Sequence, residues 1–505
     1  MFAKTHGATT LGVDGLIIDV EVDSAAGLPG FEIVGLADAL VKEAKERVRT
    51  AIRNSGIKLR QEKVTINLAP ADVRKDSSGL DLPIAVGLLA AYGLVSAATL
   101  DKYLFAAELS LEGECRGIRG ILPMTVKARE AGFEAVFVSQ ANVNEALLVD
   151  GIAVYPLDNL SQLVGFLTGQ ERLMPAKPEP VAEQAAEYLD DFADVQGQFQ
   201  CKRALEIAAA GGHNVLMVGA PGAGKTMLAR RMSTILPDLT PEEALEVTRI
   251  YSVAGLLPRE GGLIRRRPYR SPHHTSSMTA LIGGGSVPRP GEVTLAHNGV
   301  LFLDELPEFS KKTLEVLREP LEDRKITISR VHATITFPSD FILIAAANPC
   351  PCGNFLDEEQ ECTCSPGEIR QYNRKISGPL LDRIDIHIQV PRVKYDELSS
   401  KKRAESSACI RQRVVAAREI QHKRLKKYGL FCNAQMNHAL LQKLCVLEPQ
   451  AQALLEQAFK KMNLSARAYD RIVKVARTIA DLAGAKEIEA AHVAEAIQLR
   501  NDNNC

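Results

Sequence analysis

The residues of this chain most able to do chemistry form a glycine-rich segment, GAPGAGKT, at residues 219–226. The segment follows a short apolar stretch, Asn214–Val218, and leads into the helical pattern TMLARRMSTIL. In this strand–loop–helix setting, backbone N–H groups and the N-terminus of the helix surround the phosphates of a nucleotide. The lysine would contact the β- and γ-phosphates, and the threonine hydroxyl would bind Mg²⁺. The candidate nucleotide-binding residues are Gly219, Ala220, Pro221, Gly222, Ala223, Gly224, Lys225 and Thr226.

Two further apolar stretches end in polar residues that suit hydrolysis of a phosphate bond. Val300–Leu303 precedes Asp304 and Glu305, and Phe341–Ala347 precedes Asn348. We expect Asp304 to hold hydrated Mg²⁺ and Glu305 to orient and deprotonate the attacking water. The Asn348 amide would position this water beside the γ-phosphate. The alternative for Asn348 is a simple Asn-Pro turn that ends a strand.

Arginines in two later segments could complete such a site. Arg383, in GPLLDRID, could reach the γ-phosphate of the next subunit and stabilise charge in the transition state. The alternative is a surface salt bridge to Asp382 or Asp385. SARAYDRIVKVARTIADL places Arg467 and Arg471 one helical turn apart, and one of them could sense the γ-phosphate from a lid. We assign Arg467 to this role, with a solvated helix face as the alternative.

A cluster of cysteines follows Asn348 and consists of two C-x-C pairs. Four thiolates suit tetrahedral Zn²⁺, and close pairs from two turns are how small closed sites are made. The C-x-C spacing is less usual than C-x-x-C, so a redox or unliganded loop stays open. The candidate zinc ligands are Cys350, Cys352, Cys362 and Cys364.

Basic residues in two segments could contact DNA. The first segment, Arg265–Arg270, contains Tyr269 and precedes SPHHTSSMTALIGGG, whose two histidines we interpret as loop residues. The second segment, Arg324–Arg330, is predicted to be part of a β-hairpin. In a ring-shaped motor, cationic side chains of this kind track a phosphate backbone, and the alternative is a structural insertion with solvated charges. A further basic stretch, Lys401–Lys427, is interpreted as a solvated or intersubunit face, with DNA contact as the alternative. The candidate DNA-binding residues are Arg265, Arg266, Arg267, Arg270, Arg324, Lys325 and Arg330.

The elements that must position these residues divide the chain into four stretches. Strand-like and helix-like segments alternate over residues 1–170 and again over residues 191–392, so we predict the α/β fold class for both. Residues 171–190 are rich in Pro, Ala and Glu and are predicted to be a linker. The cysteines form an insertion at 349–366. Residues 393–505 follow a helical pattern without convincing strands, which predicts an all-α lid.

Composition excludes some classes of protein. With 505 residues, 46% of them hydrophobic, the chain is long enough for several globular domains. Its net charge of -1 means that a nucleic-acid site must be a local patch. The first residues lack the apolar core of a secretory signal, and the ten cysteines then indicate thiols in a reducing cytoplasm. The uncharged run Leu82–Leu100 contains Pro83 and is flanked by aspartates, which favours a buried core helix over a membrane span.

The order of these motifs resembles that of AAA+ proteins. PGEVTLAHNGVLFLDELPEF, LREPLEDRKITISR and the segment with Arg467 are similar to the magnesium-chelatase and MCM-helicase branch. The whole chain, including FEIVGLADALVKEAKERVRTAI and the CPCG segment, resembles the ComM/YifB-type magnesium-chelatase-like ATPases. The resemblance implies an ATP- and Mg²⁺-dependent hexameric ring and, within that family, an ATP-driven DNA helicase that migrates branches during natural transformation.

Residues 1–170 resemble the Lon-protease-like domain of this family, which has a ribosomal S5 domain 2-like fold. Lon carries a catalytic Ser–Lys dyad, whereas RKDSSGLDLPIA places Asp81 at the serine position, with Ser77 and Ser78 nearby. Lys127 lies one position off the lysine spacing. We therefore expect a scaffold or a DNA-binding ring surface. DNA translocation is our first hypothesis, a chelatase-type motor acting on a partner protein is the second, and an ATP-dependent protease is the third.

Overall fold

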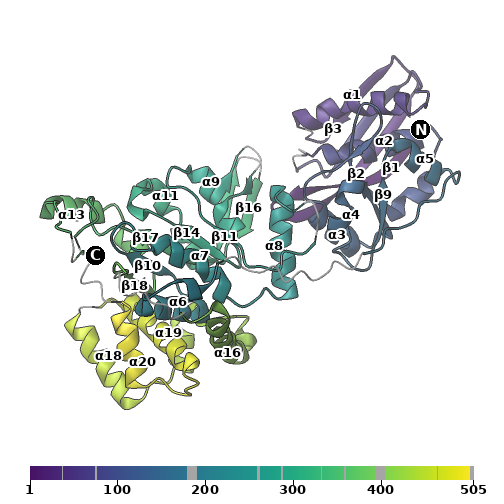
Figure 1. The fold of residues 1–505 in the computed structure, drawn as a ribbon. Helices are drawn as coiled ribbons and strands as arrows, with labels where there is room; N and C mark the ends of the chain where they lie inside the picture. The colour runs from purple at the N-terminus through teal and green to yellow at the C-terminus, as the bar shows by residue number, and fades with distance from the viewer. Residues whose placement is uncertain are drawn as a thin grey trace.

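The computed structural model divides into three parts: an N-terminal α/β domain, a central α/β domain and a C-terminal group of helices (Figure 1). Helix α8 (Pro241–Ala254) stands between the first two parts. Residues 179–189 of the predicted linker and residues 401–403 of the basic stretch lie outside the described residues. The structure describes residues 1–36, 38–73, 75, 77–178, 190–258, 262–285, 288–330, 333–355, 357, 360–393, 404–462 and 464–500.

The N-terminal domain is built on a mixed sheet with the strand order β3-β4-β2-β1-β5-β8-β9. β1 and β2 are antiparallel, whereas β1, β5, β8 and β9 run parallel to one another. Helices α1 (Ala39–Asn54), α2 (Asp81–Ala91), α3 (Ile121–Glu130), α4 (Val143–Ala146) and α5 (Leu160–Leu167) accompany the sheet. Its strands are β1 (Phe2–Leu11), β2 (Asp14–Ala25), β3 (Gly30–Val34), β4 (Lys63–Ala69), β5 (Tyr103–Ala106), β8 (Ala135–Ser139) and β9 (Ala153–Leu157); β6 (Glu108–Leu109) and β7 (Cys115–Arg116) form a small separate ribbon.

The uncharged run Leu82–Leu100 begins in helix α2, every residue of which is buried. The helix packs against β1 and β2, so the prediction of a buried core helix is confirmed for Asp81–Ala91. The run ends in a 3₁₀ helix, Ala97–Lys102. Among the helices in the described ranges, none is long and apolar enough to cross a membrane.

The central domain contains a parallel sheet with the strand order β11-β14-β17-β10-β18. Both faces of the sheet are covered, as expected for parallel strands. Val215 and Met217 face one apolar core, which includes helix α6 (Phe199–Gly211), while Leu216 and Val218 face the other. Because the strands are parallel, the residues that follow them meet at one edge. The strands are β10 (Val215–Val218), β11 (Tyr269–Arg270), β14 (Val300–Leu303), β17 (Ile342–Ala347) and β18 (Ile386–Gln389).

The predicted hairpin is confirmed as β15 (Lys325–Arg330) paired with β16 (Ala333–Pro338). Its apolar side chains form a small cluster that also contacts Val13, in the turn between β1 and β2. A Cβ atom on Gly12 would lie 2.7 Å from Ile335 Cγ2, so the two segments are in close contact. The N-terminal domain therefore rests directly on the hairpin. The neighbouring elements are α9 (Met278–Ile282), β12 (Gly283–Gly284), β13 (Arg289–Pro290), α10 (Glu292–Leu295), α11 (Lys311–Glu315) and α12 (Arg318–Asp323).

The C-terminal residues of the described chain fold into helices, with one isolated bridge between Leu447 and Ile488. Helix α16 (Ser407–Leu425) packs against α6 and α7 (Lys225–Ile235), and α19 (Ala466–Leu482) packs against α6, so these helices lie against the central domain. A buried carboxylate, Asp481, accepts hydrogen bonds from Arg424 and Arg477 and holds the group together. The remaining helices are α17 (His438–Leu444), α18 (Pro449–Lys461) and α20 (Ala490–Gln498).

Candidate functional site

The glycine-rich segment forms a loop between β10 and helix α7 (Lys225–Ile235). Gly222 and Gly224 have φ values of 77° and 91°, in the left-handed region that glycine adopts without strain. The Lys225 ammonium group donates to the carbonyl oxygens of Gly219 (2.6 Å) and Ala220 (3.0 Å). The loop thus folds around the ammonium group of its own lysine. In a nucleotide complex, phosphate oxygens would replace these two carbonyl oxygens as acceptors.

Polar groups from three parallel strands meet beside this loop. The Asn348 side-chain oxygen accepts from Lys225 at 3.1 Å, and the Thr226 hydroxyl donates to Asp304 at 2.7 Å. Hydroxyl and carboxylate oxygens are the hard ligands that Mg²⁺ prefers, and the pair opens toward solvent. The structure therefore brings the expected lysine, magnesium ligands and amide together at one edge of the sheet.

The electrostatics of the site favour an anionic ligand. Burial lowers the pKa of Lys225, while Asp304 and Glu305 act in the opposite direction. A triphosphate bound in the loop would supply further negative charge next to the ammonium group and would favour its protonated form. This arrangement suits phosphate binding better than catalysis by a neutral amine.

Glu305 is paired with a residue that the sequence did not identify as functional. His274 Nδ1 lies 3.0 Å from Glu305 Oε2. The His274 ring lies 4.1 Å from that of His273 and meets Phe309 edge-on. Both histidines lie in a turn, as predicted, but the contact with Glu305 was missed. It arises because β11, just before the turn, lies beside β14, just before Glu305.

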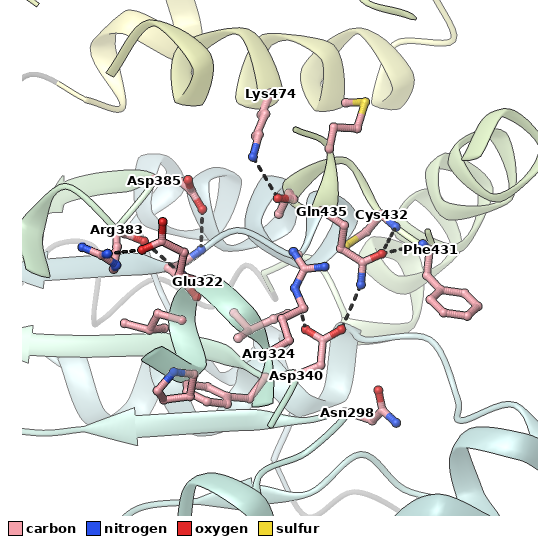
Figure 2. Close-up of a pocket in the computed structure, with 18 of the residues that line it drawn as sticks. Asn298, Glu322, Arg324, Asp340, Arg383, Asp385, Phe431, Cys432, Gln435 and Lys474 are labelled. Carbon is pink, nitrogen blue, oxygen red and sulfur yellow. Dashed lines mark hydrogen bonds and ion pairs between the residues drawn. The ribbon is translucent and has the colours of Figure 1, made fainter. Parts of the chain in front are cut away.

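Arg383 lies at the opposite edge of the sheet from the phosphate loop, since it comes before β18 rather than after it. Its guanidinium group donates to the Pro379 carbonyl oxygen at 2.8 Å and pairs with Glu322 (Figure 2). Of the two aspartates considered as partners, Asp385 pairs with Arg471 instead. Although burial opposes ionisation, Arg471 and His213 hold the pKa of Asp385 well below its usual range.

A cavity of about 430 Å³ opens at this second edge, between the central domain and the C-terminal helices. Figure 2 shows Arg383, Arg324 and Lys474 around it, from segments far apart in the sequence. Arg467, which is exposed, and Arg471 also line the cavity. The candidate arginine finger and the candidate lid sensor therefore line the same cavity, on the side away from their own phosphate loop.

The candidate DNA-binding residues divide into those next to or within ion pairs of the central domain and those exposed on the hairpin. Arg267 pairs with Glu243 at 2.9 Å, Arg270 with Glu292 at 2.6 Å, and Arg324 with Asp340 at 3.4 Å. Arg267 also donates to the carbonyl oxygens of Pro237 and Asn298, which ties it into the fold. Arg265 and Arg266 precede them, just before β11.

The hairpin carries the second group, Lys325 and Arg330, whose side chains are exposed. Alternation along β15 turns Ile326 and Ile328 inward and leaves Lys325 outward. Arg330, at the end of the strand, donates to the Gly285 carbonyl oxygen at 3.4 Å. Among the candidate residues, Arg265 is exposed as well.

The four cysteines after Asn348 come together. Their Sγ atoms all lie within 4.8 Å of one another. Cys350 Sγ is 3.3 Å from that of Cys352 and 3.7 Å from that of Cys362, and the Cys352 N–H points to Cys364 Sγ at 3.4 Å. All four are free thiols in this structure.

The N-terminal domain does not assemble a Ser–Lys dyad from the residues considered. Asp81 is buried at the start of α2 and accepts two hydrogen bonds from Arg47, at 2.9 and 3.0 Å. Lys127 pairs with Glu130 at the surface, and the Ser77 hydroxyl accepts from the Gly79 N–H. Asp81 thus has a structural partner in place of a catalytic one.

Comparison with known proteins places each part of the chain. Residues 191–398 match the model for magnesium chelatase, subunit ChlI, residues 20–142 match that for subunit ChlI of Mg-chelatase, and residues 404–500 match that for the C-terminal part of subunit ChlI. Competence protein ComM of Haemophilus influenzae is 44% identical over 99% of this chain and 97% of its own length. Protein YifB of Escherichia coli is 45% identical over 98% of this chain and 96% of its own. Lon protease 2 of Bacillus subtilis is 27% identical over 34% of the chain and 35% of its own.

Proposed function

The chain belongs to the magnesium-chelatase-like family of AAA+ ATP-binding proteins, of the ComM/YifB type, and from this premise we propose that it is an ATPase that drives translocation on DNA. The observation that carries the ATPase is the meeting of Lys225, Thr226, Asp304 and Asn348 at one edge of the parallel sheet. ATP would bind with its phosphates in the 219–226 loop. Mg²⁺, held through Thr226 and Asp304, would neutralise charge on the phosphates.

The hydrolytic step needs a base and an orienting amide. Glu305 would accept the proton of the attacking water, and Asn348 would hold that water in line with the γ-phosphate. Lys225 would stabilise the charge that develops on the phosphate oxygens. Glu305 and Asn348 come just after the buried strands β14 and β17, and Lys225 begins helix α7 after the loop that follows β10.

The positions of the arginines support a ring. Strand β10 spans four residues, or about 13 Å at ~3.3 Å per residue, and Arg383 lies at the end away from the phosphate loop. Arg383 and Arg467 would therefore act on ATP held by the neighbouring subunit. A site shared between subunits favours a closed homo-oligomer, and we propose a hexamer.

DNA is the proposed substrate of the motor, as a branch-migration helicase. The exposed cations of the β15–β16 hairpin support this proposal, because a chain of net charge -1 needs a local basic patch. We place the protein in the cytoplasm, where its thiols would stay reduced. The four clustered cysteines suit Zn²⁺. A chelatase-type motor acting on a partner protein is the alternative, and the paired Asp81 makes an ATP-dependent protease less favourable.

Replacing Lys325 and Arg330 by alanine should weaken DNA binding and flatten its dependence on salt. Removing a cation that binds one DNA phosphate should reduce the slope of log affinity against log salt by about 0.7 to 0.9. Affinity for single-stranded, duplex and four-way-junction DNA would be measured across a salt series. ATP turnover without DNA should persist, since both residues lie on the hairpin, away from the phosphate loop.

The matched control removes two cations from helix α18, through Lys460→Ala and Lys461→Ala, because both side chains are exposed. It should leave DNA affinity unchanged. An unaltered salt slope in the hairpin variant would remove the hairpin from the DNA interface. Turnover that responds to no DNA in the parent protein would favour the chelatase-type motor.

His274→Ala should raise ATP turnover in the absence of DNA. The pairing of His274 with Glu305 competes with the water that Glu305 would deprotonate. A hydrogen bond to a charged group is worth roughly 1.5 kcal/mol, so the expected increase is about tenfold. His273→Ala is the control, because that ring bonds to Thr275. Equal turnover in both variants, or a loss in His274→Ala, would contradict the assignment.

A further inference from the structure

The cysteine cluster has the dimensions of a closed metal site. Zn–S bonds of about 2.3 Å in a tetrahedron separate the sulfur atoms by about 3.8 Å. The observed separations of 3.3, 3.6 and 3.7 Å are close to this value and far from the ~2.05 Å of a disulfide. Cys350 is fully buried, and the other three ligands are half-buried. Four protein ligands leave no open position for substrate, so the site would be structural.

The first pair of cysteines is joined to the candidate sensor. Asn348 follows the buried strand β17, and Cys350 comes two residues later. The Gly353 N–H donates to the Cys350 carbonyl oxygen at 3.0 Å and closes a turn around the sulfurs. A single residue, Pro349, thus separates the cluster from Asn348, whose side-chain oxygen accepts from Lys225.

The same turn rests on the phosphate loop. A Cβ atom on Gly353 would lie 2.5 Å from Pro221 Cδ, and Gly353 has a φ of 88°. Both the close approach and the backbone conformation require glycine here. The turn that carries Cys350 and Cys352 thus supports Pro221 from outside the nucleotide site.

The second pair of cysteines directly precedes a helix that lines a cavity beside Glu305 and Asn348. Ser365, directly after Cys364, caps helix α13 (Pro366–Asn373) and exchanges hydrogen bonds with Glu368. Tyr372, on this helix, lines a cavity of about 520 Å³ together with Glu305 and Asn348. Residues that would surround the γ-phosphate therefore come from both sides of the cluster.

We infer that Zn²⁺ binds to Cys350, Cys352, Cys362 and Cys364. The bound metal holds the sensor Asn348, the phosphate loop and helix α13 in the relative positions that hydrolysis needs. The inference rests on the proposed ATPase. Zinc loss would not remove Lys225 or the loop glycines, so ATP should still bind, although the loop and Asn348 would no longer be held in position. Turnover would fall, since displacing a positioning group by about 1 Å can cost up to ~10²-fold in rate.

Metal content is tested first, on the full-length chain purified without chelator or immobilised metal. Elemental analysis should find about one zinc per chain, and a thiol-blocking mercurial should release it to a chromophoric chelator. Protein grown with cobalt should show the absorption bands of tetrahedral cobalt thiolate. Cys362→Ser with Cys364→Ser should abolish all three signals, whereas Cys409→Ser, at an exposed cysteine outside the cluster, should keep them.

Gly353→Ala tests the contact between the cysteine turn and the phosphate loop. This variant should lose turnover, because the added methyl group would press on Pro221 and the alanine would strain a turn that needs a positive φ. Gly367→Ala is the control: its Cβ would meet only Ser365 Oγ, at an ordinary 3.8 Å. Absence of zinc and of cobalt-thiolate bands in reduced protein, or full turnover in the zinc-free variant, would overturn the inference. Failure of the parent protein to hydrolyse ATP would instead contradict the proposed function and leave the metal measurements standing.

Discussion

Lys225→Ala is expected to abolish ATP hydrolysis while leaving the fold intact. The Lys225 ammonium group contacts two loop carbonyl oxygens and Asn348, so its removal takes little away from the apolar core. It does remove the cation nearest to the β- and γ-phosphates. Losing a charge of this kind costs about 10²–10³-fold in rate, and weaker ATP binding would add to that loss. Steady-state turnover and ATP affinity would be measured, with circular dichroism and thermal unfolding as checks on the fold.

Two further variants make this result specific. Glu305→Gln should bind ATP with parental affinity but fail to hydrolyse it, because an amide cannot accept the proton of the attacking water. Lys102→Ala, which removes an exposed lysine paired with Glu134 in the N-terminal domain, should behave like the parent. A folded Lys225→Ala protein with parental turnover would refute the nucleotide site. Full turnover in Glu305→Gln would assign the base elsewhere.

Arg383→Ala is expected to lose turnover by about 10³–10⁵-fold, the range for an arginine finger. Its position at the far edge of the sheet makes the effect intersubunit, which a mixing experiment detects. Subunits with Arg383→Ala keep an intact Lys225, and subunits with Lys225→Ala keep an intact Arg383. Mixed rings would therefore contain some complete sites, and turnover should exceed the sum of the two inactive proteins.

The control mixture pairs Lys225→Ala subunits with the double variant Lys225→Ala, Arg383→Ala. No complete site forms in that mixture, so turnover should stay at background. Recovery there, or parental turnover in Arg383→Ala alone, would rule out the finger. Equal inactivity of every mixture, in rings shown to exchange subunits, would place Arg383 in a structural role through its pair with Glu322.

The core of the candidate site was accessible from the sequence because its residues follow buried strands directly. A parallel sheet brings such residues to one edge, so Asp304 and Asn348 could be expected beside Lys225 without knowledge of distances. The hairpin was accessible for a similar reason, since Ile326 and Ile328 alternate with polar residues. In both cases the pattern is local: an uninterrupted apolar run marks β14 and β17, and alternation marks β15.

Contacts that depend on strand order or on distant partners were not accessible. His274 meets Glu305 only because the edge strand β11 lies next to β14. The ion pair of Arg270 with Glu292 depends on tertiary packing, and a count of positive charges gives no sign of it. The position of Arg383 across the sheet from its own phosphate loop likewise needs the completed topology.

The contact between Val13 and the β15–β16 hairpin links residues more than three hundred positions apart in the chain. The N-terminal domain and the hairpin therefore share one apolar interface. A substitution in the β1–β2 turn would favour a compensating substitution in the hairpin. A chimera between relatives would need to exchange the β1–β2 turn and the hairpin together. A fragment that begins after the linker would expose Ile335 and its neighbours to water and would invite self-association.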